Sequence, residues 1–389
     1  MRLIVAASCL LLAACGSAPQ APAPAEPPPA PVEAIEPVEP VAEPSPPEPP
    51  PPPANVSFAM VGDMMIGTDF PENRLPDDDA VGFLADVTPF LASVDVAIGN
   101  LEGVLKAGGE PGKPCSNPRA CWLFRSPPRY AERFRAAGFD LLSLANNHAR
   151  DFGEEGRDAS MAALASVGIH HSGRDGTTTS LEVNGVSIGF IAFAVTKNSN
   201  MLLDYELSEM RVRALASMYD ILVVSFHGGA EGVDHTRLPF AEEEYYNEPR
   251  GDVVYFARTM IDAGADLVFG HGPHIVRAME RYKGRLIAYS LGNFATYYGI
   301  SVSGIKGVAP IVLATLDETG EFIDGEIIST RQIRPAGPTL DPNGRALRQL
   351  RVLSQQDFGN SGLRFDSDGR LVAIPRPDPE PHELQLTDP

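Results

Sequence analysis

The chain has 389 residues, with 51 acidic against 31 basic side chains, and its formal net charge at pH 7 is -20. This acidic balance argues against nucleic acid and against anionic lipid headgroups as partners. Roughly 280 residues, from position 55 to about 335, have the composition of a folded domain, which is enough for one sizeable hydrophobic core.

The first 15 residues resemble a bacterial lipoprotein signal. Arg2 precedes an apolar run that is too short to span a bilayer and ends in Leu12-Ala13-Ala14-Cys15, which resembles a lipobox. We therefore predict that residues 1–14 are removed and that Cys15 becomes a lipidated N-terminus in the bacterial cell envelope. Gly16 supplies no acidic retention signal for the inner membrane, which favours the periplasmic face of the outer membrane. The alternative is a buried helix with an ordinary cysteine.

Residues 15–54 are predicted to be a disordered tether. Residues 16–54 contain 17 of the 37 prolines and no Lys or Arg. Such a segment cannot bury an apolar core and favours extended polyproline conformations. At about 3.1 Å per residue, it could reach on the order of 100 Å from a membrane. A specific partner for the proline-rich run is left open.

Strand-like and helix-like segments alternate through residues 55–335. Short β-branched runs predict strands, and amphipathic spacing between them predicts helices. This alternation is typical of a layered α/β domain, in which the last strands form a meander. The predicted strands are Val56–Val61, Val94–Ile98, Leu141–Leu144, Val186–Phe193, Ile221–Phe226, Leu267–Phe269, Arg285–Tyr289 and Pro310–Leu316; the predicted helices are Ala80–Ala92, Pro128–Ala137, Glu154–Val167, Glu206–Met218 and Asp252–Ala263.

Two further segments carry predictions of their own. Residues 336–389 are polar and proline-rich, so we expect a tail that wraps the surface or stays mobile, with a short helix near Arg345 to Leu353. Cys115 and Cys121 lie close together in a loop rich in Gly, Pro and Asn, and an oxidising envelope favours a disulfide between them. A cysteine-based metal site is the weaker alternative, because the chain has no second thiol pair.

Polar side chains follow three of the predicted strands at the point where each strand ends. Three adjacent polar groups after the third strand would be costly to bury without partners. Because open α/β sheets bind ligands at the carboxyl ends of their strands, we expect these side chains to share one site. Asp and Glu in such positions are good metal ligands. The residues are Asp63, Asn100, Glu102, Asn146, Asn147 and His148.

Histidines follow two later strands. His227 ends the most apolar strand and precedes two glycines, although a lone histidine there is often a satisfied core residue. His271 and His274 can project two imidazoles from the tight loop Gly270-His271-Gly272-Pro273-His274. Glu231 and Asn293 are nearby candidates for substrate contacts. Asp151, in contrast, is expected to cap the helix that follows it.

In this order, the motifs look like those of the capsule synthesis protein CapA family, which is associated with poly-γ-glutamate capsules. The resemblance covers roughly residues 55–315. The family is in turn similar to calcineurin-like metallophosphoesterases, which implies a two-sheet α/β sandwich with flanking helices. The motifs are Gly62-Asp63-Met64-Met65-Ile66-Gly67, Asn100-Leu101-Glu102, Ala145-Asn146-Asn147-His148 with Asp151 and Gly153, His227-Gly228-Gly229 with Glu231, Gly270-His271-Gly272-Pro273-His274, and Tyr289-Ser290-Leu291-Gly292-Asn293-Phe294.

By this resemblance, Asp63, Asn147, His227, His271 and His274 fall at metal-ligand positions, and His148 falls where the phosphatases keep a general acid. The pattern departs from the phosphatases at three places. Met65 replaces a histidine, Asn100 and Glu102 stand where a bridging aspartate is usual, and the first imidazole of the last histidine motif is displaced by one position. A thioether is a poor ligand for a hard cation, so one divalent ion, two ions or none remain open.

Two functions are compatible with these residues. The first is a metal-dependent hydrolase for a phosphoester or an amide of an anionic envelope polymer such as poly-γ-glutamate. In it, Asp63 and Glu102 hold the metal or take a proton, and His148 or His274 donates a proton to the leaving group. Asn100, Asn146, Glu231 and Asn293 would contact the substrate. The alternative is a non-catalytic polymer-binding or assembly protein, or a spacer of envelope components.

Overall fold

The computed structural model describes residues 55–113, 122–377 and 384. The predicted signal peptide and tether, the lipidation site Cys15 and the predicted disulfide partners Cys115 and Cys121 lie outside this part of the chain. Within the described residues, no helix combines the length and the apolar character that crossing a bilayer requires.

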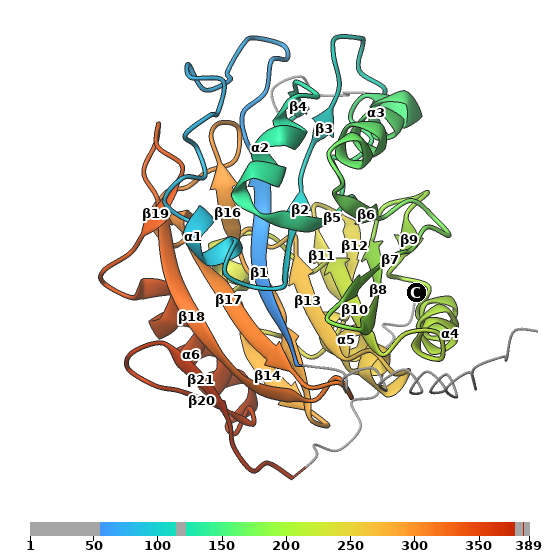
Figure 1. Cartoon of the computed structure of the whole chain (residues 1–389), viewed down its shortest axis with the longest axis vertical. Coiled ribbons are helices and arrows are strands. Elements are labelled where there is room, and N and C mark those ends of the chain that lie inside the picture. The colour runs from blue at the N-terminus through green and yellow to red at the C-terminus, as the bar shows by residue number, and fades with distance from the viewer. Residues whose placement is uncertain (1–54, 114–121, 378–383, 385–389) are drawn as a thin grey trace, which may run out of the picture. The chain divides into compact units, whose positions relative to one another are not determined.

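Two large β-sheets form the centre of the domain (Figure 1). The first has ten strands, and the pairs β1–β2, β2–β5 and β5–β6 in it are parallel. In order, its strands are β20 (Leu363–Phe365), β21 (Arg370–Ala373), β18 (Phe322–Gln332), β17 (Val308–Leu316), β1 (Val56–Met65), β2 (Val96–Leu101), β5 (Phe139–Ser143) and β6 (His170–Ser172), with β16 (Asn293–Thr296) on β1 and β19 (Pro338–Leu340) on β18.

The second sheet has seven strands, with parallel pairing from β8 through β10 and β13 to β15. Its order is β14 (Met279–Tyr282), β15 (Arg285–Ala288), β13 (Leu267–His271), β10 (Ile221–His227), β8 (Val186–Ala194) and β7 (Thr179–Val183), with β9 (Asn200–Met201) on β8. Two small ladders complete the strands: β3 (Val104–Leu105) with β4 (Arg125–Ser126), and β11 (Glu243–Tyr245) with β12 (Glu248–Gly251).

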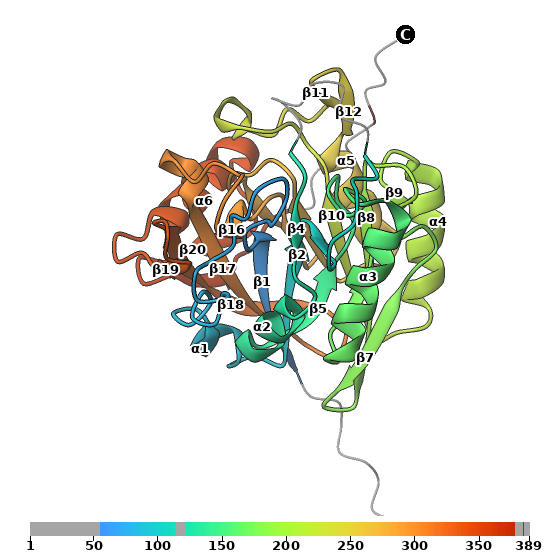
Figure 2. The same ribbon diagram turned by 90° about the horizontal axis from the view of Figure 1, so that it is seen from above.

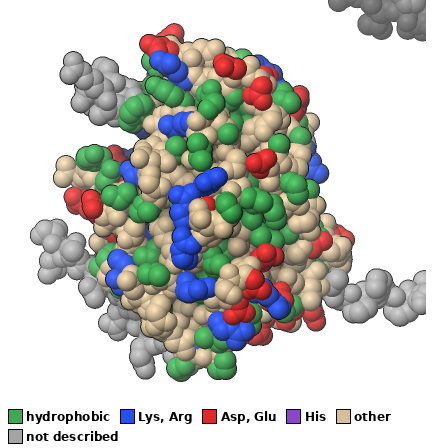
Figure 3. Space-filling view, turned by 90° about the vertical axis from the view of Figure 1, so that its left-hand side faces the viewer, with side chains coloured by type: hydrophobic (Ala, Val, Ile, Leu, Met, Phe, Trp, Pro, Cys, Tyr) green, Lys and Arg blue, Asp and Glu red, His purple; other side chains and the backbone are tan. Residues whose placement is uncertain are grey.

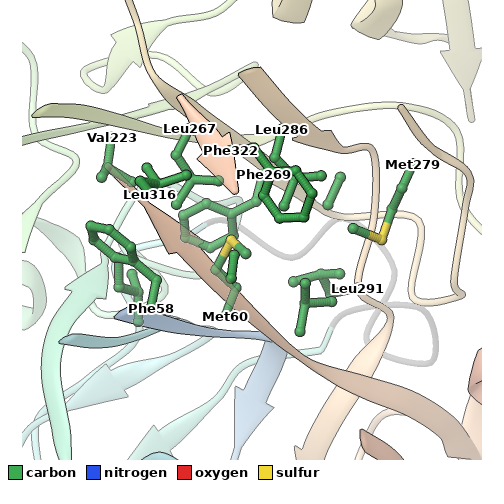
Figure 4. Close-up of a cluster of buried hydrophobic side chains, with 14 of the residues drawn as sticks. Phe58, Met60, Val223, Leu267, Phe269, Met279, Leu286, Leu291, Leu316 and Phe322 are labelled. Atoms are coloured by element: carbon green, nitrogen blue, oxygen red, sulfur yellow. The ribbon is translucent and has the colours of Figure 1, made fainter. Parts of the chain in front are cut away.

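The main hydrophobic core lies between the two sheets. Figure 4 shows Phe58 and Met60 of β1 facing Val223, Leu267 and other side chains of the opposite sheet. Alternation along β1 sends Ala59 into a second core on the outer face of the ten-stranded sheet. Both faces of β1 are therefore buried, which explains its near-continuous apolar sequence.

Helices cover the outer faces of both sheets. In Figure 2, α1 and α2 lie on one side of the sheets and α5 on the other. Apolar side chains of α1, α2 and α3 pack with the ten-stranded sheet, and those of α4 and α5 pack with the seven-stranded sheet. The helices are α1 (Thr88–Leu91), α2 (Tyr130–Ala137), α3 (Gly153–Ser166), α4 (Tyr205–Ala216), α5 (Val253–Asp262) and α6 (Arg345–Phe358), with 3-10 turns η1 (Val233–His235) and η2 (Gly304–Gly307). The predicted two-sheet α/β sandwich with flanking helices is confirmed.

The helix predicted over Ala80–Ala92 is wrong for most of its length. Only Thr88–Leu91 is α-helical. Asp79 and Ala80 have positive φ angles, and the turns that follow close through bonds to the third residue back, such as Phe83 N to Ala80 O. Such turns keep the apolar side chains on one side, so the spacing alone could not distinguish them from an α-helix.

The C-terminal segment differs from the predicted surface tail. Residues 338–340, 363–365 and 370–373 are strands of the ten-stranded sheet. On α6, Leu347 and Leu350 belong to the core between the two sheets. The folded domain therefore continues to at least Ala373. The segment resembles a surface tail in the sequence because its apolar side chains are widely spaced among polar ones.

Candidate metal centre

The carboxyl ends of strands from both sheets bring the predicted polar residues together. In the ten-stranded sheet, Asp63 on β1 is in register with Asn100 on β2 and with Asn293 on β16. In the seven-stranded sheet, His227 on β10 is in register with His271 on β13. The residues that are in register form a row across each sheet, and each row lies near the carboxyl ends of the parallel strands. The expected position at strand ends is therefore confirmed.

Side chains from the two rows meet in one buried cluster. Ligand atoms of Asp63, Glu102 and His227 all lie within 4.8 Å of one another, and all three residues are buried. Glu102 Oε1 lies 3.7 Å from His227 Nε2 and 3.5 Å from His274 Nε2. Asp63 Oδ1 lies 3.7 Å from His271 Nδ1. The cluster contains carboxylates from one sheet and imidazoles from the other.

Several polar atoms of this cluster are buried without a hydrogen-bond partner among the described residues. Burial of such a group costs about 1 to 3 kcal/mol, and more for a charged one. Their convergence on one point therefore lowers the stability of the fold unless a bound cation compensates for the lost hydrogen bonds. The mixed oxygen and imidazole donors suit a divalent transition metal such as zinc or manganese. These atoms are both carboxylate oxygens of Glu102, Asn147 Oδ1 and both ring nitrogens of His227 and His271, while Asp63 Oδ2 has an ion pair with His274 at 3.1 Å.

Burial determines the charge of the histidine ligands. It lowers the pKa of His227 to about 3 and that of His271 to about 4, so both rings are neutral at physiological pH. Burial also raises the pKa of Glu102 to about 7. For Asp63, burial acts in the opposite direction, but contact with His274 and the other imidazoles holds the pKa well below its usual range. Neutral imidazoles beside an ionised aspartate are ready to bind a cation.

His274 differs from the other two histidines. Burial would lower its pKa, but the surrounding carboxylates, led by Glu102, raise it to about 10. Its Nδ1 is 3.0 Å from Asn293 Oδ1 and 3.1 Å from Asp63 Oδ2, while Nε2 faces Glu102. The residue has a φ of 57°, a left-handed conformation that is uncommon for a non-glycine residue. This conformation turns the ring towards the two carboxylates.

Amide side chains hold the carboxylates in place. Asn100 Nδ2 donates to Asp63 Oδ1 at 2.8 Å, and Asn146 Nδ2 donates to Asn100 Oδ1 at 3.0 Å. Asn293 Nδ2 donates to the backbone oxygens of His274 and Lys306. Asn100, Asn146 and Asn293 thus use their amides on the protein itself. Their predicted contact with substrate remains a prediction.

His148 stands at the edge of the cluster with a partner of its own. Its Nδ1 lies 2.8 Å from Asp151 Oδ2, and its ring packs against Phe124 at 4.4 Å between centroids. The expected capping role of Asp151 is wrong, because α3 has Phe152 at its N-cap and no side-chain cap. In the sequence, the signal for this contact was the position of Asp151, three residues after His148. The carboxylate fixes the ring so that Nε2 is the free nitrogen.

Two buried arginines beside the loop after β10 were missed by sequence reasoning, whereas Glu231 on that loop was a candidate. Glu231 Oε2 lies 4.0 Å from His274 Nε2, and Glu231 Oε1 pairs with the buried Arg250 at 3.0 Å. Buried Arg277 binds both oxygens of Glu243 and the backbone oxygen of Ala230. Arg250 lies on the β11–β12 hairpin and Arg277 in the segment before β14, and no local pattern connects them with the site.

The fold and the site define a class: an α/β sandwich with a buried carboxylate and imidazole cluster where the strands of two sheets end. The sequence profile of the bacterial capsule synthesis protein PGA_cap family matches residues 57–298, so the chain belongs to that family. It is 27% identical over 342 residues to a protein named capsule biosynthesis protein CapA of Bacillus anthracis, covering 81% of this chain and 77% of the relative.

Other proteins match over a smaller part of the chain or at lower identity. A protein named PGA biosynthesis protein CapA of Bacillus subtilis is 29% identical over 256 residues, covering 61% of this chain and 63% of the relative. Among solved structures, a putative 5'-nucleotidase of Staphylococcus aureus has a TM-score of 0.42 at 14% identity, covering 78% of this chain and 58% of the other. An NAD nucleotidase of Haemophilus influenzae has a TM-score of 0.37 at 12% identity, covering 77% and 62%.

Proposed function

We propose that this protein is a metal-dependent hydrolase that acts on a phosphoester or amide of an anionic envelope polymer during its synthesis or export. The observation that carries the proposal is the convergence of buried, unpartnered oxygen and nitrogen atoms of Glu102, His227 and His271 on Asp63. A purely structural core has no reason to collect such atoms at one point.

The proposed ligand residues differ in the charge and the donor atoms that they supply. Asp63 and Glu102 supply negative charge, and His227 and His271 supply neutral nitrogen donors. Asn147 Oδ1 is a further donor with no other partner among the described residues. A divalent ion held by this set would lower the pKa of water and polarise a phosphoryl or carbonyl oxygen. Glu102, with a pKa near 7, can accept or return a proton at neutral pH.

His148 is the proposed proton donor to the leaving group. Its backbone N–H donates to Asn146 Oδ1 at 3.0 Å, and Asn146 in turn donates to Asn100, so His148 is connected to the cluster. Asp151 orients the ring through Nδ1 and leaves Nε2 for the substrate. Phe124 packs against the ring and restricts its rotation. His274 is held by Asn293 and carries the positive charge that balances the two carboxylates.

The polymer and the location are supported by different observations. Relatives of this chain are named for capsule and PGA biosynthesis, which supports an anionic polymer as substrate. The lipobox-like Leu12-Ala13-Ala14-Cys15 supports a lipid anchor on Cys15 and a place in the cell envelope. Metabolic labelling with a fatty-acid analogue tests the anchor, because Cys15→Ser should abolish incorporation if the proposal holds.

The decisive experiment combines metal analysis with a turnover assay. Protein purified without chelator should contain a divalent metal and hydrolyse a generic aryl phosphate, and both should be lost in Asp63→Asn. His274→Ala should reduce turnover strongly. His170→Ala is a matched control, because His170 is exposed and its ring contacts only Thr179 among the hydrogen bonds of the described residues. Metal-free wild-type protein without turnover, but with retained polymer binding, would favour the non-catalytic assembly role instead.

A further inference from the structure

An open groove of about 580 Å³ lies between α6 and η2. Its floor is apolar, and two of its lining side chains are unusually exposed for their type: Ile305 at 36% and Val352 at 51%. Val308 and Leu353, which are buried, continue the apolar surface below them. A groove of this kind can accept the methylene groups of a ligand.

The rim of the groove is basic. Arg345 and Arg348 line it together with Gln349, and no carboxylate is part of the described lining. Arg345 is already paired with Asp341 at 2.7 Å. Arg348 donates to the backbone oxygen of Asn343, and no ion pair to a carboxylate is found for it within the described residues. Arg348 therefore offers the groove a cation that is not neutralised.

The exposed face of α6 extends this basic character. Arg351 follows at the same spacing as Arg345 and Arg348, so the three lie along one side of the helix, and the helix has no acidic residue before Asp357. In a chain of net charge -20 this is a local reversal of sign. Figure 3 shows basic side chains gathered in a row beside hydrophobic ones, on the side of the molecule where β19 and α6 lie in Figure 1.

Both walls of the groove are bonded to the segments that form the metal site. On the η2 wall, the backbone oxygen of Lys306 accepts from Nδ2 of Asn293, the residue that holds His274. On the α6 wall, Gln349 Nε2 donates to the backbone oxygen of Val276, two residues beyond His274. A chain lying in the groove would therefore be next to the loop that carries His274.

We propose that the groove binds an extended anionic polyamide, with its methylene groups on Ile305 and Val352 and a carboxylate on Arg348. The proposal rests on the proposed function, since it supplies the polymer to the same site. A carboxylate-bearing chain matches the basic rim, and short aliphatic links between its amides match the apolar floor. A second copy of this protein is the competing occupant, and the test distinguishes it.

The test uses the full-length protein and a fluorescent oligomer of γ-linked glutamate, followed by anisotropy at low and at physiological salt. Arg348→Ala should weaken binding by about tenfold, and Arg348→Glu by more, because one charge-assisted contact is lost and then reversed. Arg213→Ala on α4 is the matched control, since Arg213 is also an exposed helical arginine.

Three results would overturn the proposal: equal binding by Arg348→Glu and wild type, no binding by wild type, or equal binding of the uncharged γ-linked glutamine oligomer. The last would identify an apolar docking surface instead, including one for a second copy. Because aryl phosphate turnover and metal content do not depend on the groove, they test the proposed hydrolase separately. Thermal melting of each variant controls for folding, and exposed Arg348 should leave it unchanged.

Discussion

A buried imidazole binds a cation only when it has lost its proton, and burial ensures this for His227 and His271. His274 is different, because three carboxylates surround it and stabilise its charged form. The same residue type therefore serves two purposes within a few ångströms. Two rings are able to donate electron pairs to a cation, and the third balances the negative charge of Asp63 and Glu102.

Asp151→Asn should lower kcat on an aryl phosphate by about 100-fold. The imidazolium form of His148 carries the Nε2 proton that would be donated, and a neutral amide at position 151 no longer stabilises it as the carboxylate of Asp151 does. Metal content should remain at the wild-type level, because the cluster of Asp63, Glu102 and His227 is untouched. Steady-state kinetics with metal analysis of the same samples checks both parts.

His148→Ala provides the matching comparison for that variant. If Asp151 acts only through His148, the double variant should be no slower than His148→Ala alone. Additive losses would show that Asp151 has an independent role, for instance through its second contact, the backbone N–H of Phe124 at 2.8 Å.

At the residue scale, the sequence was most informative where a polar side chain directly follows an apolar strand. Asp63 and His227 were found in this way, because the end of a parallel strand is a local feature. Asp151 was assigned to helix capping, because capping is the commoner use of an acidic residue before a helix. Arg250 was missed, because its pairing with Glu231 depends on a hairpin that folds back over the site.

At the scale of single elements, two aspartates show how position changes the acidity of a group. Asp266 directly precedes β13, and its Oδ2 accepts from Leu222 N; burial raises its pKa to about 6. Asp220 directly precedes the neighbouring β10 and accepts from both the backbone and the hydroxyl of Ser187, which lowers its pKa. The two carboxylates should therefore respond to pH in opposite directions.

Asp266→Asn should gain stability relative to wild type as the pH rises. The unfolded chain releases the Asp266 proton near pH 3.8, while the folded protein keeps it until about pH 6. The contribution of Asp266 to the free energy of unfolding is therefore full below pH 3.8 and is lost as the pH rises through 6. Urea unfolding should show a relative gain on the order of 2 kcal/mol for the variant between pH 4 and pH 7.

Asp220→Asn is the control, with the opposite sign. Its lowered folded pKa means that its contribution is present above pH 3.8 and is lost as the pH falls. The free energy of unfolding of the variant should thus fall relative to that of wild type as the pH rises from acid to neutral. Parallel pH profiles for Asp266→Asn and Asp220→Asn would contradict the interpretation of both sites.

Helix α6 provides a second prediction at the element scale. Leu350→Ala should lower the free energy of unfolding by about 2 to 5 kcal/mol, because its side chain is fully buried between the two sheets. Val352→Ala on the exposed face of the same helix should change it by about 0.5 kcal/mol or less. Denaturant unfolding of the two variants checks this. Equal losses would mean that α6 is not part of the core.

Some elements could be predicted from the sequence and others could not. The central strands β1, β8 and β10 were evident, because burial on both faces produces long apolar runs. The strands β20 and β21 are short and half polar, since only one face of each is buried, and a sequence of that kind is indistinguishable from a loop. Their place in the sheet depends on β18, which is distant in sequence.

For the whole molecule, the site joins the two sheets through their strand ends. Removal of bound metal with a chelator should therefore lower the melting temperature by several degrees, since saturation at 100 times Kd contributes about 2.7 kcal/mol. The reason is that both carboxylate oxygens of Glu102 and the ring nitrogens of His227 and His271 would be left buried without a hydrogen-bond partner among the described residues. Differential scanning calorimetry with and without chelator measures the shift, and Asp63→Asn should show little change on chelation.

Because the carboxylates come from the first part of the domain and the imidazoles from the second, half of the chain alone cannot capture an ion firmly. Metal binding is thereby delayed until the two sheets have packed against each other. Under the proposed export of this chain, the metal site would be complete only after folding at its destination.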